Sequence, residues 1–259
     1  MLLPTVQETG ELEGTNLQVE IPAELAGVFN IADNMEGVVP RLPQIKVLHT
    51  AQLFEMPDES KAETFEGVIL DQHPANAWWE TDISETGGGA VPDCFSMDGI
   101  TPDLTQEKVQ SQKCADCKQN QFGSERKGTG GKDCKNMKRL HILMEGSLLP
   151  RRVTVAPTSI RSFDGYMTGL VDRGLPYACV VTVFSLIKKE ASGFVFAEAK
   201  FMKDRVLKPE ELQVVAKFIK QYKDPARQQD IQADEYMNGD SLEDQGNEPK
   251  QEPEDDIPF

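Results

Sequence analysis

A long segment rich in Gly, Asp, Lys and Cys, residues 87–136, most constrains what this chain can fold into. It shows no clear strand or helix pattern, and a structureless loop of this length is uncommon inside a compact domain. Four cysteines lie in the segment: Cys94, Cys114, Cys117 and Cys134. Cys114 and Cys117 form a C-x-x-C pair, which supplies adjacent corners of a tetrahedral zinc site. We therefore predict a structural zinc ion with all four thiolates as ligands, which leaves no open position for a catalytic water.

Other ligand sets fit the same region. An iron–sulfur cluster uses the same four thiolates, and His141 or His73 could replace Cys94 as the fourth zinc ligand. Flanking lysines would offset the negative charge of a zinc–thiolate centre: Lys113, Lys118, Lys132 and Lys135. The fifth cysteine, Cys179, lies within an apolar strand pattern, which favours a buried core position.

Strand patterns rich in β-branched and aromatic residues flank this segment on both sides. The expected elements are strands at 44–50, 64–79, 140–144 and 151–155, a helix from Pro157 to Gly174, a hairpin of 179–187 with 194–201, and a helix at 209–222. Several strands, then one helix and then a hairpin follow one another in an OB-fold, a Greek-key barrel that often binds single-stranded nucleic acid. We predict a mainly β fold with two helices: an OB-like barrel with an inserted zinc-binding loop and a disordered acidic C-terminal tail. A generic α+β domain is the alternative.

Charge divides the chain into three parts. The net charge is −16 over residues 1–106, +9 over 107–220 and −9 over 221–259. We therefore predict an acidic N-terminal arm at 1–40, a nucleic-acid-binding domain at 41–222 and an acidic tail at 223–259. A basic middle between acidic ends is typical of a domain that binds a polyanion.

A protein that binds single-stranded nucleic acid without sequence preference needs basic side chains to contact the phosphates and exposed aromatic rings on which bases stack. The candidate rings are Trp78, Trp79, Phe122 and Tyr166, and the candidate cations are Arg126, Lys127, Lys132, Lys135, Lys138, Arg139, Arg151, Arg152 and Lys188. Adjacent residues of a strand face opposite sides, so we expect at least one of Trp78 and Trp79 to be exposed or to cover an edge. For the same reason, at most one of Arg151 and Arg152 lines a given groove.

The chain ends in Asp255, Asp256, Ile257, Pro258 and Phe259, an apolar tip on an acidic run. This tip resembles the C-terminal peptide of bacterial single-stranded DNA-binding proteins. The resemblance implies that the Phe ring enters an apolar pocket of a replication, recombination or repair protein, while basic residues of that partner meet the carboxylates. It implies a DNA-coating protein that recruits such enzymes.

The middle of the chain, residues 64–202, resembles a family of phage and mobile-element proteins whose function is uncharacterised. The shared motifs are Cys94-Phe95-Ser96-Met97-Asp98-Gly99, Cys114-Ala115-Asp116-Cys117, Asn120-Gln121-Phe122-Gly123-Ser124, Cys134-Lys135-Asn136 and Pro157-Thr158-Ser159. This resemblance implies a phage-encoded protein in the cytoplasm of a bacterial host.

Several functions are disfavoured. The run from Gly128 to Lys132 lacks the first glycine and the Ser/Thr of a P-loop, and three separated histidines offer little for acid–base catalysis. No apolar run approaches the roughly 20 residues that span a bilayer, and the N-terminus lacks signal-peptide features. We predict a non-enzymatic single-stranded DNA-binding protein and leave self-association open. The alternatives are an adaptor that occupies the host's tip-docking sites without binding DNA, and a metal-dependent nuclease or recombination enzyme.

Overall fold

The protein is described from a computed structural model. The structure describes residues 41–81, 91–126, 128, 130–191 and 194–227, together with the short pieces 5–6, 12–13, 34 and 36–38. The C-terminal tip, Lys127 and most of the predicted N-terminal arm lie outside the described residues. None of the described helices is long and apolar enough to cross a membrane.

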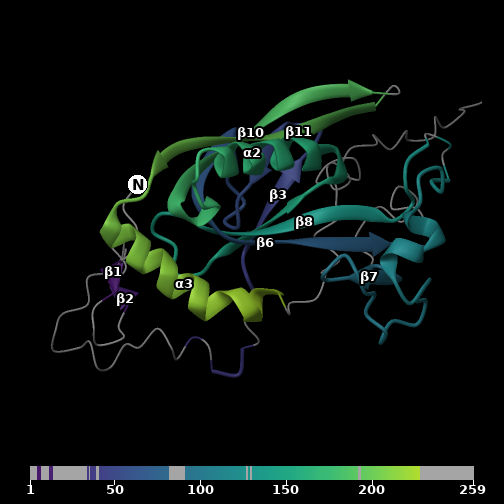
Figure 1. The fold of residues 1–259 in the computed structure, drawn as a ribbon, viewed down its shortest axis with the longest axis horizontal. Helices are drawn as coiled ribbons and strands as arrows, with labels where there is room; N and C mark the ends of the chain where they lie inside the picture. The colour runs from purple at the N-terminus through teal and green to yellow at the C-terminus, as the bar shows by residue number, and fades with distance from the viewer. Residues whose placement is uncertain are drawn as a thin grey trace, which may run out of the picture.

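The fold is mainly β with two helices, as the sequence predicts (Figure 1). Its strands are β1 Thr5–Val6, β2 Leu12–Glu13, β3 Gln44–Leu48, β4 Leu53–Glu55, β5 Lys61–Ala62, β6 Thr64–Trp78, β7 Cys94–Ser96, β8 Lys135–Leu143, β9 Arg151–Val155, β10 Val180–Ala191 and β11 Phe194–Val206. The helices are α2 Ile160–Asp172 and α3 Pro209–Arg227, and short 3-10 turns cover Cys114–Asp116, Lys118–Asn120, Pro157–Ser159 and Tyr177–Cys179.

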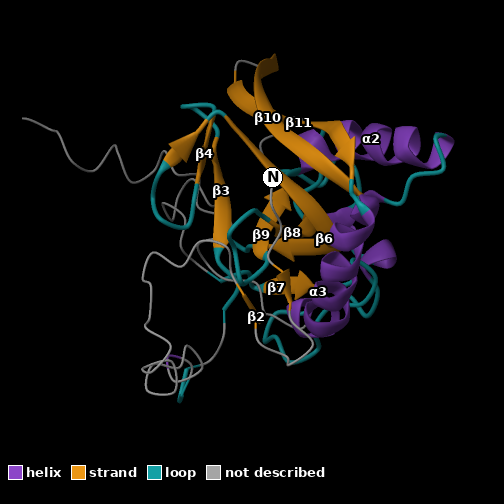
Figure 2. Ribbon diagram, turned by 90° about the vertical axis from the view of Figure 1, so that its left-hand side faces the viewer, coloured by secondary structure: helices purple, strands orange, loops and turns teal. Residues whose placement is uncertain are grey.

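One curled sheet holds nearly all of these strands (Figure 2). Its order is β11-β10-β6-β8-β9-β3-β4-β5, with β7 beside the end of β6, and β1 pairs with β2 in a separate two-stranded sheet. Neighbouring strands are antiparallel except β3 and β9, which are parallel. The sheet forms a half-barrel, and this shape is compatible with an OB-like barrel.

Alternation along β6 directs its side chains to two different cores. Ile69 packs with Leu140, Ile142 and Phe163 of α2 in the first core. Val68 and Leu70 face the other side, where they pack with Phe218 of α3. The two helices therefore cover opposite faces of β6.

The open edge of the half-barrel is partly closed by side chains. The backbone N–H of Ala197 in β11 donates to Nδ1 of His49, just after β3, over 3.3 Å. The N–H of Ala199 donates to Oγ of Ser159, just before α2, over 2.9 Å. These bonds satisfy edge amides that would otherwise invite pairing with another strand.

Element boundaries agree with the sequence prediction at the end of α2 and differ from it at the end of α3. Gly174, with φ of 65°, follows the end of α2 as predicted. By contrast, α3 continues through Pro225 to Arg227 instead of ending at Tyr222, so the first residues assigned to the tail are helical. Arg227 makes two hydrogen bonds to Asp71, and this tertiary contact favours the extra turn.

Close packing at Gly67 generates a stability prediction. A Cβ atom there would lie 2.3 Å from Cγ2 of Ile142, which is fully buried. We expect Gly67→Ala to lower the free energy of unfolding by about 1–3 kcal/mol because the core is overpacked. Gly169→Ala on α2 meets no atom within 4 Å and should raise that free energy by about 0.5–1 kcal/mol. Urea denaturation tests both variants, and equal effects would contradict the packing argument.

A carboxylate at the start of α3 predicts a pH dependence of stability. Both oxygens of Glu211 accept hydrogen bonds from Arg205 over 2.7 Å, and one also accepts the N–H of Lys208. The bonds from Arg205 lower the pKa of Glu211 to about 2. This stabilisation is present above the ordinary carboxyl pKa and is lost as the pH falls towards 2.

We expect Glu211→Gln to reduce the free energy of unfolding at pH 7 by roughly 1.5–3 kcal/mol. The difference from the parent protein should shrink as the pH is lowered from 5 to about 2. Glu210→Gln, at the neighbouring exposed position, is the matched control and should change little. A gap between Glu211→Gln and the parent that stays constant with pH would show that the charge is unimportant.

Candidate functional site

Pairing around the end of β6 brings the four predicted zinc ligands to one region. Cys94 begins β7 and lies opposite Trp78 of β6. Cys134 directly precedes β8, whose first residue pairs with Ala77 of β6. Cys114 and Cys117 come from the intervening loop. The loop backbone joins these segments, because the N–H of Cys134 donates to the carbonyl of Gln119 over 2.8 Å.

The four thiols line a common pocket next to Trp78. Cys114, Cys117 and Cys134 are buried, and Cys94 is half-buried. Burial raises the pKa of Cys134 to about 12, and the nearby sulfur atoms of the other three cysteines add to the effect. Among the described residues, these four sulfurs are not grouped closely enough to form a metal-binding cluster as they stand. Thiolates on a tetrahedral zinc ion lie about 3.8 Å apart, so binding would draw these side chains closer.

The cysteine loop is fastened to the end of β6 through polar contacts. The indole N–H of Trp78 donates to Oδ2 of Asp133 over 2.6 Å. Arg126 pairs with the same carboxylate at 3.0 Å and donates to the backbone carbonyls of Trp79 and Glu80. Trp78 and Trp79 are 6% and 5% exposed. Of the two outcomes expected for these rings, exposure is not found, because the loop covers one face of the strand end and a core cluster covers the other.

Phe122 is the most exposed of the large hydrophobic side chains in the described part of the chain, with 83% of its surface accessible. Nζ of Lys132 lies 5.1 Å from the centre of its ring, within cation–π range. The same Nζ donates to Asn120 and Asn136 at 3.2 and 2.9 Å, so the cation is held in place. An exposed ring beside a fixed cation can stack a base and meet a phosphate.

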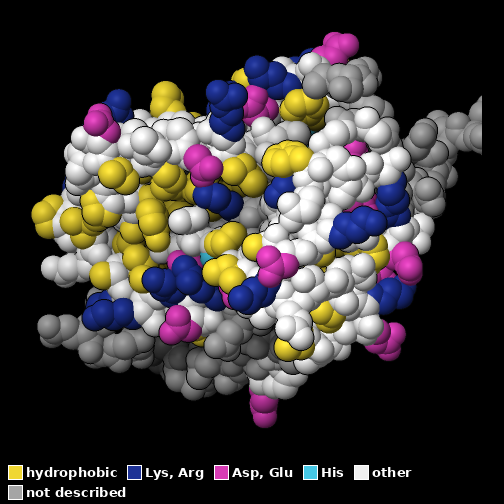
Figure 3. Space-filling view, turned by 45° about the vertical axis from the view of Figure 1, so that its right-hand side comes forward, with side chains coloured by type: hydrophobic (Ala, Val, Ile, Leu, Met, Phe, Trp, Pro, Cys, Tyr) yellow, Lys and Arg dark blue, Asp and Glu magenta, His cyan; other side chains and the backbone are white. Residues whose placement is uncertain are grey.

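Several of the other predicted DNA contacts are buried or paired in the described part of the chain. Arg139 and Arg152 are buried, and Arg151 lies half-buried against Met144. Lys138 forms an ion pair with Asp164 of α2 at 2.6 Å. The ring of Tyr166 packs on the first core, and its hydroxyl shares a hydrogen bond with the hydroxyl of Thr182. Lys135 is half-buried, whereas Arg126 and Lys188 are exposed. Figure 3 shows Lys and Arg side chains in separate groups with acidic and hydrophobic side chains between them.

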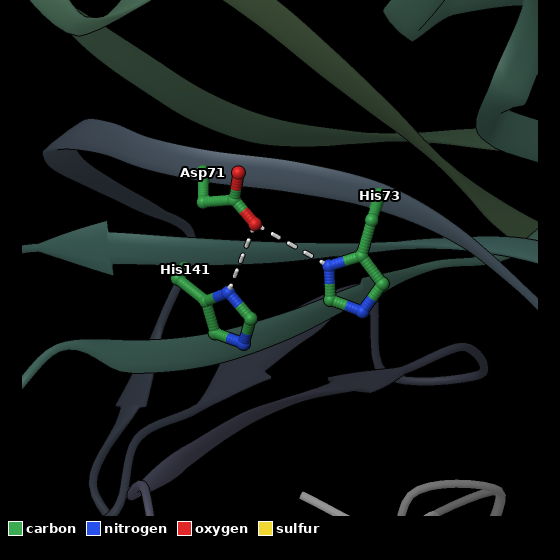
Figure 4. A group of neighbouring side chains, drawn as sticks. All are labelled: Asp71, His73 and His141. Carbon is green, nitrogen blue, oxygen red and sulfur yellow. Dashed lines mark ion pairs between the residues drawn. The ribbon is translucent and has the colours of Figure 1, made fainter. Parts of the chain in front are cut away.

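A second group of potential ligands lies in the middle of the sheet (Figure 4). Asp71 and His73 of β6 share one face, and His141 of β8 lies directly opposite Asp71. Oδ2 of Asp71 is 3.5 Å from Nδ1 of His73 and 3.8 Å from Nδ1 of His141. All three residues are at most 4% exposed, and their ligand atoms lie within 4.8 Å of one another. This group could hold a metal ion.

Arg227 of α3 completes the surroundings of Asp71. Its Nε and Nη2 donate to the two carboxylate oxygens over 2.6 and 2.7 Å. Burial alone would raise the pKa of Asp71, but the contacts with His141, His73 and Arg227 outweigh it and hold that pKa far below its usual range. Burial lowers the pKa of His141, although Asp71 opposes the shift. The carboxylate of Asp71 is therefore ionised, and burial favours the uncharged form of His141.

Sequence reasoning considered these histidines only as substitutes for Cys94 and missed Asp71. The sequence signal that could have identified this group is Asp71-x-His73 within a predicted strand. Residues two apart on a strand face the same side, so these two potential ligands lie next to each other. The partner, His141, is distant in sequence, and only the pairing of β6 with β8 identifies it.

Comparisons with protein-family models, curated proteins and solved structures find no match for this chain.

Proposed function

We propose that this protein binds single-stranded DNA through an OB-like core and catalyses no reaction on it. The observation that carries the proposal is the order β11-β10-β6-β8-β9 in the sheet. Strands β6, β8 and β9 are antiparallel neighbours, α2 follows, and the first strand of the next hairpin returns beside β6. This arrangement is compatible with that of an OB-fold. Here β3 lies beside β9, and β11 reaches the neighbouring segments through His49 and Ser159.

This correspondence gives the exposed candidate contacts a shared role. OB-folds bind oligonucleotides on their second and third strands and on the loops between strands 1 and 2 and between strands 4 and 5. In this chain those elements are β8 and β9, the cysteine loop, and the tip of the β10–β11 hairpin. Phe122 and Lys132 belong to the first loop, and Lys188 lies near the hairpin tip. The cysteine loop and the ends of β10 and β11 that face the turn both lie on the right-hand side of Figure 1.

Exposed and buried candidates take different parts in the proposal. Phe122 stacks a base while Lys132 meets a phosphate, because these side chains are exposed or half-buried. Arg126 holds the loop in place, since its guanidinium already binds Asp133 and two backbone carbonyls. Trp78, Trp79 and Tyr166 stabilise the fold, since their rings are already packed. The proposed surface is therefore smaller than the sequence suggests.

A zinc ion bound by Cys94, Cys114, Cys117 and Cys134 is proposed to hold the cysteine loop in its binding shape. Support comes from the shared pocket and from the burial of three thiols, whose ionisation a divalent cation would favour. The zinc is structural, because four thiolates fill a tetrahedral shell. The tip at residues 255–259 is proposed to dock replication, recombination or repair proteins, on the strength of its sequence alone.

Zinc content tests the cysteine site. The untagged full chain should contain zinc by mass spectrometry, and Cys94→Ser or Cys134→Ser should lose the thiolate-bound ion and loosen the loop. Cys179→Ser is the control and should keep that ion, because Cys179 lies outside the pocket lining. An unchanged zinc content in both pocket variants would rule out this ligand set.

Titration of fluorescent oligo-dT tests the DNA-binding surface. Phe122→Ala should weaken binding by roughly 5- to 150-fold, which corresponds to about 1–3 kcal/mol for one stacked base. Phe122→Tyr should retain most of the affinity because the ring remains. Leu104→Ala is the matched control, since Leu104 is 69% exposed on the same loop but offers no ring. Affinity should fall with salt, with a slope of about −0.7 for each phosphate contacted.

The alternatives predict other outcomes of the same titration. Absence of binding at low salt would remove the main proposal and favour the adaptor that only occupies tip-docking sites. Metal-dependent cleavage of the oligonucleotide would favour the nuclease. Equal binding by Phe122→Ala and Leu104→Ala would retain DNA binding but place the surface elsewhere.

A further inference from the structure

His73 and His141 are buried without satisfying their ring nitrogens. They are 4% and 2% exposed, and no ring nitrogen of either has a hydrogen-bond partner among the described residues. A buried polar atom without a partner costs about 1–3 kcal/mol. Both Nδ1 atoms are turned towards one oxygen of Asp71, as Figure 4 shows.

We propose that Asp71, His73 and His141 bind a divalent transition-metal ion, Zn²⁺ or a metal with similar ligand preference, at a site separate from the cysteine pocket. Two imidazoles and one carboxylate suit zinc and its first-row neighbours, whereas Mg²⁺ and Ca²⁺ prefer oxygen ligands. Coordination through Nδ1 satisfies one nitrogen of each ring. This inference does not rest on DNA binding.

The spacing of the three ligand atoms suits such an ion after a small contraction. Nitrogen and oxygen ligands at about 2.0–2.1 Å from a tetrahedral ion lie about 3.4 Å apart. The separations from Oδ2 of Asp71 are 3.5 and 3.8 Å, and all three atoms lie within 4.8 Å of one another. Coordination therefore requires each Nδ1 to approach Oδ2 of Asp71 by no more than a few tenths of an ångström.

Arg227 acts as a positioning residue for the carboxylate ligand. Its two hydrogen bonds orient Asp71, and a carboxylate oxygen has lone pairs for both Nε of Arg227 and a metal. Outer contacts of this kind fix the orientation of metal ligands. The bound ion would tie β6 to β8, and through Arg227 both strands to the end of α3. With its protein ligands almost fully buried, the site is structural.

The two proposed sites differ in their ligands, so spectroscopy separates them. Metal-free, untagged full-length protein is titrated with Co²⁺, whose thiolate complexes have strong charge-transfer bands that His and Asp complexes lack. We expect about two bound equivalents per chain, one with these bands and one with only weak visible absorption. This measurement on the parent protein needs no variant to fold.

Variants then show which residues bind the second, weakly absorbing equivalent of Co²⁺. His73→Ala and His141→Ala should each lose the weakly absorbing equivalent and keep the charge-transfer bands. His49→Ala is the matched control and should keep both, because His49 contacts β11 and is outside the group. Cys114→Ser should show the reverse pattern, with the charge-transfer bands lost.

Two results would overturn the proposal. One is a parent protein whose only bound cobalt shows thiolate bands. The other is a weakly absorbing equivalent that survives in both His73→Ala and His141→Ala. In either case the two histidines and Asp71 form a metal-free polar cluster. Loss of DNA binding in Phe122→Ala bears on the proposed function alone and leaves this site unaffected.

Discussion

The antiparallel pairing of β6 with β8 is the interaction on which the rest of the structure depends. It runs from Val68 opposite Leu143 to Ala77 opposite Lys135. One face of the pair supplies Ile69, Leu140 and Ile142 to the first core, while the other places Asp71 opposite His141. The end of the same pairing brings Cys134 towards Cys94. A slip of one residue in this register would exchange the two faces and separate both ligand groups.

Burial of polar groups within a β sheet requires compensation, and the polar face of β6 and β8 obtains it in different ways. Asp71 receives two hydrogen bonds from Arg227, which brings the end of α3 onto the sheet. Trp78 donates to Asp133, which brings the cysteine loop onto the strand end. These contacts join segments far apart in sequence, because a buried donor or acceptor without a partner is costly. The polar contacts thereby select where the helix and the loop lie against the sheet.

Local patterns were sufficient to predict much of the fold. Strand β9 and the end of α2 agree with the sequence prediction, since β-branched alternation and a glycine with positive φ act locally. The cysteines were recognisable as a group because C-x-x-C spacing is itself a ligand geometry. Exposure was harder to predict: alternation correctly places Trp78 and Trp79 on opposite faces, but it cannot reveal that a loop covers one face and a core cluster the other.

The sequence alone determined the mainly β fold with two helices, the four-cysteine loop, and the acidic ends around a basic middle. These properties depend on residue type and on spacing along the chain. The tertiary structure decided that Arg139 and Arg152 are buried, that Phe122 is exposed beside Lys132, and that Asp71 and His73 face His141. The physical reason is that burial and side-chain contacts depend on strand register and on what covers each face, and both are set by residues distant in the sequence.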